Sequence, residues 1–170
     1  MAEFQQNIWA PWRMRYIEQL ADRAAGECFL CQYFQSPADD RQNHVLWRGE
    51  RALVTLNRFP YSPGHLLVAP AAHGAELADL SEQVLTDVML RIRDMQRVLS
   101  AALEAQGFNI GMNIGPCAGA GLPDHLHWHI VPRWRGDTNF MPVLADVKVM
   151  PEAMDRIHDK LQETARRLRL

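Results

Sequence analysis

Hydrophobic residues recur at helical spacing over residues 79–105, the longest periodic segment of the chain. The apolar positions lie three or four residues apart, as on one face of a helix, at Val84, Leu85, Val88, Met89, Ile92, Met95, Leu99 and Leu103. Asp79, with Glu82 three residues later, predicts the N-terminal cap of this helix, and Gly107 predicts its end. Two further helices are predicted: a short one over 9–20 that begins near Pro11, and a C-terminal amphipathic one over 151–168.

Five short apolar runs bounded by turn residues predict strands. They cover residues 44–48, 51–56, 65–68, 108–114 and 126–131, and residues 26–42 are predicted to be a loop. Strands interrupted by one long helix indicate an α+β fold, with a mostly antiparallel sheet, that long helix and a C-terminal helix. Since the chain has no internal repeat or long linker, we expect one domain over 1–170, with a core at about 28–135 and a short extension at each end.

The composition limits the classes of molecule that the protein is expected to bind. The chain has 170 residues and a formal net charge of −2, so it has no excess of basic residues for nucleic acid, and a bound nucleotide would need a local site. No apolar run is as long as a membrane span, and residues 1–6 do not resemble a signal peptide. We therefore expect a cytoplasmic protein that does not contact membranes. The 3 cysteines favour a metal site or free thiols over a disulfide framework.

Three histidines alternate in the stretch 125–131. Because side chains of a strand point alternately to its two sides, His125, His127 and His129 are predicted to share one face. The residues between them are apolar and are predicted to face the core. Surface histidines on a strand are the plain alternative, but a triplet from 7 histidines in the whole chain favours a functional site.

Two kinds of chemistry fit this row. All three imidazoles could bind one metal, although the outer α-carbons would lie about 13 Å apart, so that an adjacent pair fits better. Alternatively, one histidine is a nucleophile toward phosphorus and its neighbours orient it. The loop before the row favours the second interpretation, because Gly119 and Gly121 allow main-chain N–H groups to approach a phosphate. The loop is not a P-loop, since no Gly-Lys-Ser/Thr follows it.

The row His-Leu-His-Trp-His-Ile-Val resembles the signature of the histidine triad (HIT) superfamily, in which the middle histidine becomes transiently nucleotidylated. Residues 57–65, Asn-Arg-Phe-Pro-Tyr-Ser-Pro-Gly-His, resemble the ribose-binding strand and turn of the fragile-histidine-triad branch. Residues 9–16 and 134–143 are more similar to bacterial diadenosine tetraphosphate phosphorylases of the same family. The resemblance implies an α+β fold, a homodimer, and a purine nucleotide or dinucleoside polyphosphate substrate that is cleaved at its α-phosphate.

The resemblance also implies roles for individual residues. His127 would be the nucleophile, His129 would contact the phosphate and stabilise its charge, and His65 would support the nucleophile. Asn57 would bind the ribose hydroxyls and Asn113 would lie near the phosphate. Water or inorganic phosphate would then release the nucleotide, and Arg133 and Arg135 just past the row are candidates for binding that phosphate.

One position departs from the family pattern. Relatives often have Ser or Thr three residues before the first histidine of the row, as a proton donor to the leaving group, and this chain has Leu122 there. Three alternatives stay open, and the departure favours the last of them. They are a zinc hydrolase that uses the row as a catalytic metal site, a nucleoside phosphoramidate hydrolase, and a nucleotide-binding module without turnover.

Cys28-Phe29-Leu30-Cys31 has the spacing of half a zinc site. Zinc-bearing members of the resembled family complete such a pair with two histidines, which here would be His73 and His125. The resemblance therefore implies a structural Zn²⁺, while reduced core thiols are the alternative for the cysteine pair.

Overall fold

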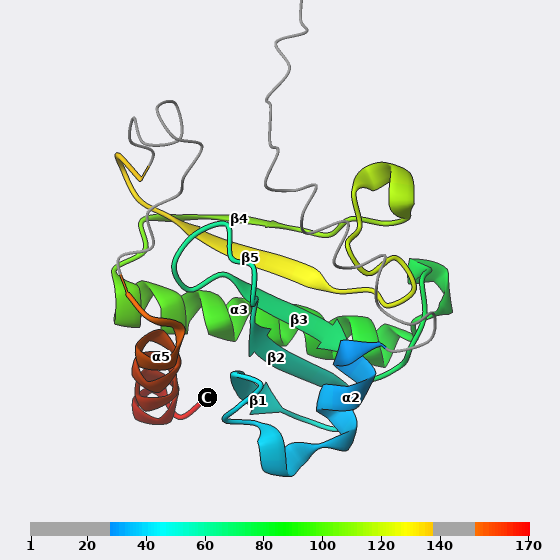
Figure 1. Cartoon of the computed structure of the whole chain (residues 1–170), viewed down its shortest axis with the longest axis horizontal. Coiled ribbons are helices and arrows are strands. Elements are labelled where there is room, and N and C mark those ends of the chain that lie inside the picture. Colours follow the sequence, from blue (N-terminus) through cyan, green and yellow to red (C-terminus); the bar gives the residue numbers. More distant parts are fainter. Residues whose placement is uncertain (1–27, 138–151) are drawn as a thin grey trace, which may run out of the picture. The chain divides into compact units, whose positions relative to one another are not determined.

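A five-stranded sheet forms the centre of the fold in the computed structural model, which describes residues 28–137 and 152–170 (Figure 1). Its strands are β1 (Val45–Arg48), β2 (Ala52–Leu56), β3 (Leu66–Pro70), β4 (Gly107–Gly111) and β5 (Trp128–Arg133). The order in the sheet is β1-β2-β3-β5-β4, and every neighbouring pair is antiparallel. β5 therefore lies between β3 and β4, and its residue His129 has Leu67 and Gly111 as cross-strand neighbours.

Helix α3 (Glu82–Leu103) lies along one face of this sheet (Figure 1). Its inward residues Val88, Ile92, Met95 and Leu99 are buried with apolar side chains of β2, β3 and β5. Every residue of β2 and β3 is buried, as expected for central strands covered on their faces. The periodicity over 79–105 therefore predicted the helix and the side of it that faces the core.

The caps of α3 differ from the predicted ones. Asp79 ends a separate 3-10 turn, η2 (Leu77–Asp79), and the cap is Ser81, whose hydroxyl accepts a hydrogen bond from the N–H of Val84 at 3.3 Å. The helix ends at Glu104 in the left-handed conformation, with φ 54°, and Gly107 instead begins β4. Ser81 is a better placed cap than Asp79, because it directly precedes the first helical residue.

Helix α5 (Met154–Leu168) packs against α3 and β1. Ile157 and Leu161 contribute to the same core, and the fully buried His158 joins the helix to the sheet. Arg41 donates to Nδ1 of His158 at 2.6 Å, and so Nε2 carries the proton that is donated to the carbonyl of Val45 at 3.0 Å. The sequence predicted this helix over 151–168.

Residues 26–42 are not simply a loop, as the sequence had predicted. They contain helix α2 (Phe29–Gln35) and the 3-10 turn η1 (Pro37–Asp39). Leu30 and Tyr33 of α2 are buried, and the sulfur of Cys28 accepts a hydrogen bond from the N–H of Cys31 at the start of the helix. A helix of seven residues is not stable by its own propensity, so packing rather than local sequence produces it.

The turn between β2 and β3 ends at the buried His65, directly before β3. Its last residue before the histidine, Gly64, has φ 76°, and a Cβ atom there would lie 2.5 Å from Cδ1 of Leu103. Only glycine satisfies both constraints without strain. The hydroxyl of Ser62 donates to the carbonyl of Pro132 at 2.9 Å, which holds the turn against β5.

The α+β fold with an antiparallel sheet, one long helix and a C-terminal helix is confirmed. Against the predicted 108–114, β4 begins one residue earlier and ends three residues earlier, and β5 lies two residues later than the predicted 126–131. The predicted helix over 9–20 and most of the segment 134–143 lie outside the described residues, and the extent of a single domain over 1–170 stays a prediction. Among helices of the described residues, none combines the length and apolar character needed to cross a bilayer.

Candidate active site and metal centre

The histidine row lies where β5 begins. Leu126, Trp128 and Ile130 join the core, as the alternation predicted. β5 starts at Trp128, so that His125 and His127 precede the strand and only His129 of the row lies within it. The rings of His127 and His129 are neighbours, with their centroids 5.0 Å apart.

The hydrogen bonding of His127 determines which of its two ring nitrogens can act as a nucleophile. Its Nδ1 lies 2.9 Å from the main-chain carbonyl oxygen of His125, and since a carbonyl only accepts, Nδ1 carries the proton. Nε2 of the neutral ring therefore holds the lone pair. Burial lowers the pKa of His127, which favours this neutral form, and the hydrogen bond to His125 opposes the shift. A neutral imidazole with a bare Nε2 is a competent nucleophile.

His65 and His129 form a hydrogen-bonded pair beside it. Nε2 of His65 lies 3.0 Å from Nδ1 of His129, and their ring centroids are 5.1 Å apart. His65 is completely buried. The sequence had assigned His65 to the support of the nucleophile, and the direct contact that the structure gives it within the row is with His129.

The turn residue Asn57 contacts His65 through its side chain. The Asn57 amide nitrogen lies 3.3 Å from Nδ1 of His65, and its amide oxygen accepts a hydrogen bond from the N–H of Phe59 at 2.9 Å. The N–H of Tyr61 donates to the same Nδ1 at 3.1 Å, and the Tyr61 ring stacks on the imidazole. The sequence pattern assigns no role to Tyr61, and its aromatic side chain within the motif 57–65 is the feature that could have indicated one.

Hydrogen bonds within the glycine loop involve both main-chain groups of Gly119. Asn113 donates from its amide to the carbonyl of Gly119 at 3.3 Å, which brings two residues predicted near the phosphate into contact. The N–H of Gly119, however, donates to the carbonyl of Pro116 at 2.9 Å within the 3-10 turn η3 (Pro116–Ala118). A phosphate bound at Gly119 would have to replace that bond, whereas Gly121 lies beyond this turn.

Leu122 packs beside the cysteine pair. It contacts a small apolar cluster formed by Cys28, Leu30 and Ala69. Leu122 therefore packs among apolar side chains next to one of the candidate metal ligands, Cys28.

Arg133 is engaged by an acidic partner. Its guanidinium donates to both carboxylate oxygens of Asp137 and to the amide oxygen of Asn109 at 2.8 Å. The carboxylate raises the pKa of Arg133 and neutralises its charge locally. Arg133 is therefore a weaker candidate for binding an inorganic phosphate than the sequence suggested. Arg135 is exposed, and only its main-chain N–H has a described hydrogen bond, to Gln106.

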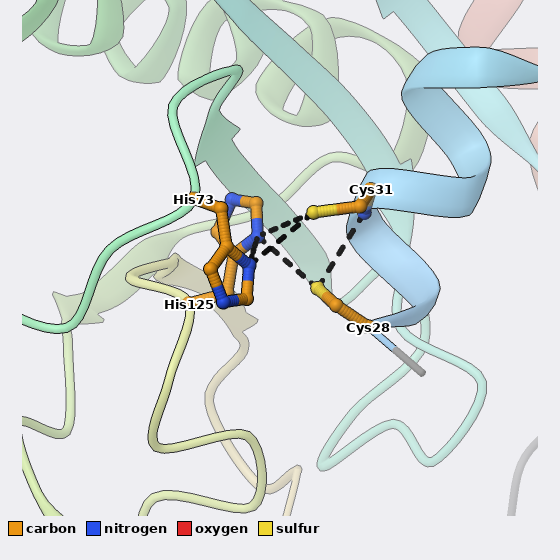
Figure 2. A group of neighbouring side chains, drawn as sticks. All are labelled: Cys28, Cys31, His73 and His125. Atoms are coloured by element: carbon orange, nitrogen blue, oxygen red, sulfur yellow. Dashed lines mark hydrogen bonds between the residues drawn. The ribbon is translucent and has the colours of Figure 1, made fainter. Parts of the chain in front are cut away.

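Cys28, Cys31, His73 and His125 point toward one another from three separate parts of the chain (Figure 2). The cysteines come from the start of α2, His73 from the loop after β3, and His125 from the segment before β5. The four ligand atoms all lie within 4.8 Å of one another. These residues are up to 97 positions apart along the chain, so that only the fold brings them together.

The distances suit a tetrahedral ion. Nδ1 of His125 lies 3.1 Å from the sulfur of Cys28 and 3.3 Å from Nδ1 of His73, which is 3.3 Å from the sulfur of Cys31. Zinc bonds of 2.0 to 2.3 Å at tetrahedral angles separate neighbouring ligand atoms by about 3.3 to 3.8 Å. Two sulfurs and two imidazole nitrogens are also the donor set that Zn²⁺ prefers.

The hydrogen bonds of His125 orient it for a metal. Nε2 donates to the carbonyl of Pro70 at 2.9 Å, which leaves the Nδ1 lone pair directed at the cysteines. Burial lowers the pKa of His125, and burial with the nearby Cys28 raises the pKa of Cys31 to about 11. A cation bound among these groups would stabilise the Cys31 thiolate and so lower the pKa that burial raises. The residues therefore fit a structural zinc ion.

The three imidazoles of the row do not converge on one point. Nδ1 of His125 faces the cysteines, Nδ1 of His127 donates to a main-chain carbonyl, and Nδ1 of His129 faces His65. This arrangement does not favour the interpretation in which one metal binds the whole row.

Comparisons with known proteins identify the family of the chain. The chain is 35% identical over 153 residues to the AP-4-A phosphorylase of Mycobacterium tuberculosis, covering 88% of this chain and 78% of that protein. It is 36% identical over 95 residues to an asymmetrical bis(5'-nucleosyl)-tetraphosphatase of Schizosaccharomyces pombe, covering 56% of this chain and 52% of that protein. A Zn-bound histidine triad family protein from Mycobacterium smegmatis shares the fold with a TM-score of 0.69 at 23% identity, over 86% of this chain and 98% of that one. The HIT domain family matches residues 39–136. The chain therefore belongs to the HIT domain family.

Proposed function

We propose that this protein cleaves dinucleoside polyphosphates, such as diadenosine tetraphosphate, at the α-phosphate through a nucleotidyl-histidine on His127. The observation that carries the proposal is the hydrogen bond from Nδ1 of His127 to the carbonyl of His125, because it leaves Nε2 as the nucleophile. The names of two relatives, a phosphorylase of AP-4-A and an asymmetrical tetraphosphatase, support this substrate class.

The reaction has two steps. In the first, the Nε2 lone pair of His127 bonds to the α-phosphorus while the bond to the bridging oxygen breaks, and the polyphosphate leaves with the bonding electrons. The ring becomes positively charged, and the carbonyl of His125 stabilises its Nδ1–H. In the second, an oxygen of water or inorganic phosphate attacks the phosphorus, the P–N bond breaks and its electrons return to Nε2, and the proton lost by the acceptor passes to solvent.

The neighbouring residues would bind and orient the nucleotide. His129 would stabilise the charge on the phosphate oxygens, and His65 would act through His129, which it contacts. Asn57 keeps one amide hydrogen and one oxygen lone pair beyond its two internal bonds, so it can also bind ribose hydroxyls. Asn113, Gly119 and Gly121 would lie along the phosphate.

We also propose that Cys28, Cys31, His73 and His125 hold a structural Zn²⁺. The support is the fit of their four ligand atoms to a tetrahedral ion, together with the Zn-bound state of the similar histidine triad protein from Mycobacterium smegmatis. A zinc ion with four protein ligands has no open position for water, so it would stabilise the fold and supply no nucleophile. A homodimer, implied by the family resemblance, is part of the proposal and is tested by sedimentation velocity.

Product analysis tests the reaction. Purified protein is incubated with diadenosine tetraphosphate, with and without millimolar phosphate, and the nucleotides are separated by chromatography. Transfer to phosphate yields ADP and ATP, whereas transfer to water yields AMP and ATP. The 78% coverage of the phosphorylase relative favours ADP in the presence of phosphate. AMP in every condition would make the protein a hydrolase, and no product in any condition would contradict the proposed activity.

Leu122 favours one other candidate, a nucleotide-binding module without turnover, because no hydroxyl is available at that position to protonate a leaving group. ATP is a good leaving group and needs little such help, whereas the amine released from a nucleoside phosphoramidate needs a proton. Parallel assays with diadenosine tetraphosphate and adenosine 5'-phosphoramidate separate the alternatives. We expect faster release from the tetraphosphate, and binding of both without release would favour the module.

A further inference from the structure

We infer that Tyr61 is a positioning residue that sets the hydrogen placement of His129 through His65. The inference rests on the proposed function, in which His129 stabilises the charge of the phosphate. It concerns a residue that touches neither the candidate nucleophile nor the metal ligands in the described contacts. A chain of hydrogen bonds from the turn 57–65 to β5 connects Tyr61 to His129.

This series of hydrogen bonds begins at Asn57, whose side-chain orientation is determined by a main-chain donor. The N–H of Phe59 can only donate, and it lies 2.9 Å from the Asn57 side-chain oxygen. The amide NH₂ of Asn57 therefore faces the other way, where it lies 3.3 Å from Nδ1 of His65. The turn itself thus decides which group of Asn57 meets the histidine.

His65 then receives two donors on the same nitrogen. The NH₂ of Asn57 and the N–H of Tyr61, at 3.1 Å, both point at Nδ1, so Nδ1 holds the lone pair and the proton lies on Nε2. Nε2 donates across 3.0 Å to Nδ1 of His129. Nδ1 of His129 is thereby an acceptor, and the proton of the neutral His129 ring lies on its Nε2.

The ring of Tyr61 covers this arrangement. It stacks on the His65 imidazole with centroids 4.8 Å apart and planes 24° from parallel, and its centroid lies 6.1 Å from that of His129. Tyr61 is 45% exposed while His65 is 0% exposed, which places the aromatic ring on the solvent side of the buried histidine. Excluding water strengthens the bond between the two histidines, because the local dielectric constant is lower.

The tautomer of His129 determines whether its outer ring nitrogen attracts or repels a phosphate oxygen. A neutral His129 with its proton on Nε2 presents an N–H donor on the side of the ring away from His65, where a phosphate oxygen gains from it. The opposite tautomer would present a lone pair to the same oxygen. Tyr61 thus contributes to transition-state stabilisation through His65 and His129.

The first test reads the tautomers directly. Long-range ¹H–¹⁵N correlation spectra of the ligand-free full chain report which ring nitrogen of each histidine is protonated. In the unmodified protein we expect Nε2–H forms for both His65 and His129. Tyr61→Phe keeps the ring and the main-chain N–H and should preserve both forms. Tyr61→Ala also keeps the main-chain N–H but removes the ring that shields the histidine pair from water, so we expect mixed tautomers at His129. A single unchanged tautomer in this variant would overturn the inference.

A matched control comes from the same turn. Phe59 is 50% exposed, and Phe59→Ala retains the main-chain N–H that orients Asn57, so its histidine spectra should remain those of the unmodified protein. Thermal melts check that each variant is folded. Equal disturbance of His129 by Phe59→Ala and Tyr61→Ala would assign the effect to the turn in general and contradict a specific role of Tyr61.

The second test is kinetic. Tyr61→Ala should lower kcat for diadenosine tetraphosphate by about tenfold with little change in KM, as expected when a group that orients a phosphate contact is lost. Tyr61→Phe should retain kcat, and a normal kcat in Tyr61→Ala would overturn the positioning role. The spectra need no turnover, so a protein inactive toward this substrate would contradict the proposed function while the tautomers at His129 still decide the inference.

Discussion

The main-chain carbonyl of His125 accepts the Nδ1–H of His127 at 2.9 Å, while the His125 side chain faces Cys28 at 3.1 Å. One residue thus belongs to the candidate metal centre through its ring and to the candidate active site through its main chain. The N–H of the intervening Leu126 donates to the carbonyl of Gly74 at 2.9 Å, directly after His73. The two sites are therefore built on the same short piece of backbone.

Replacing the candidate nucleophile should abolish turnover. We expect His127→Ala to lower kcat by more than about a thousandfold, because covalent catalysis is lost, while nucleotide affinity changes little. Stopped assays and equilibrium binding measure the two effects. His44→Asn is a matched control that should keep activity. His44 contacts Asp155 of α5 and has φ 52°, a left-handed conformation that Asn tolerates. Residual activity above about a thousandth would exclude nucleophilic catalysis by His127.

Zinc should copurify with the protein at about one ion per chain if the four ligands form a closed tetrahedral site. Cys31→Ser should lower the zinc content and reduce the thermal midpoint by about 5 °C or more, because metal binding contributes to folding free energy. Activity per folded molecule should fall less. Cys117→Ser is the control, since Cys117 is exposed and outside the ligand group, and it should leave both zinc and melting unchanged. Metal analysis without zinc in protein prepared without chelators would contradict the site.

Glycine should be required at position 64. Gly64→Ala forces a side chain into a backbone with φ 76° and places Cβ 2.5 Å from Leu103, so we expect a loss of about 2 kcal/mol in the free energy of unfolding. Denaturant titration measures the loss. At Gly74 a Cβ would meet nothing within 4 Å, and Gly74→Ala should be nearly neutral. Equal free energies of unfolding for the two variants would show that the Leu103 side chain moves aside at little cost, and would contradict the requirement for glycine.

Arg133 should not be needed for the use of phosphate. Its guanidinium is already paired with Asp137, so Arg133→Gln should change the KM for phosphate by less than about threefold. Arg135→Gln should have the larger effect if an arginine past β5 binds the acceptor. Initial rates over a range of phosphate concentrations compare the two variants. A tenfold or larger increase in the KM for phosphate with Arg133→Gln would return this residue to the acceptor site.

Features that depend on local backbone geometry alone could be predicted from the sequence. The repeat over 79–105 requires only helical spacing to place Val88, Ile92 and Met95 on one side, and they are buried there. Alternation in an extended segment similarly separates His127 from the core residue Trp128. Neighbours along the chain fix these relationships before any tertiary contact forms. The short helix α2 escaped prediction because its stability comes from burying Leu30 and Tyr33.

Contacts between distant parts of the chain determine which atom each functional side chain meets, and the sequence does not reveal them. The acceptors for His127 and His125 are main-chain carbonyls, and a carbonyl is present at every residue, so no residue type in the sequence marks the one at Pro70. The stacking of Tyr61 on His65 likewise depends on how the turn folds back. Hydrogen bonds act over about 3 Å, so the assembled core that brings distant segments together decides the partners, and with them the nitrogen that His127 offers to a substrate.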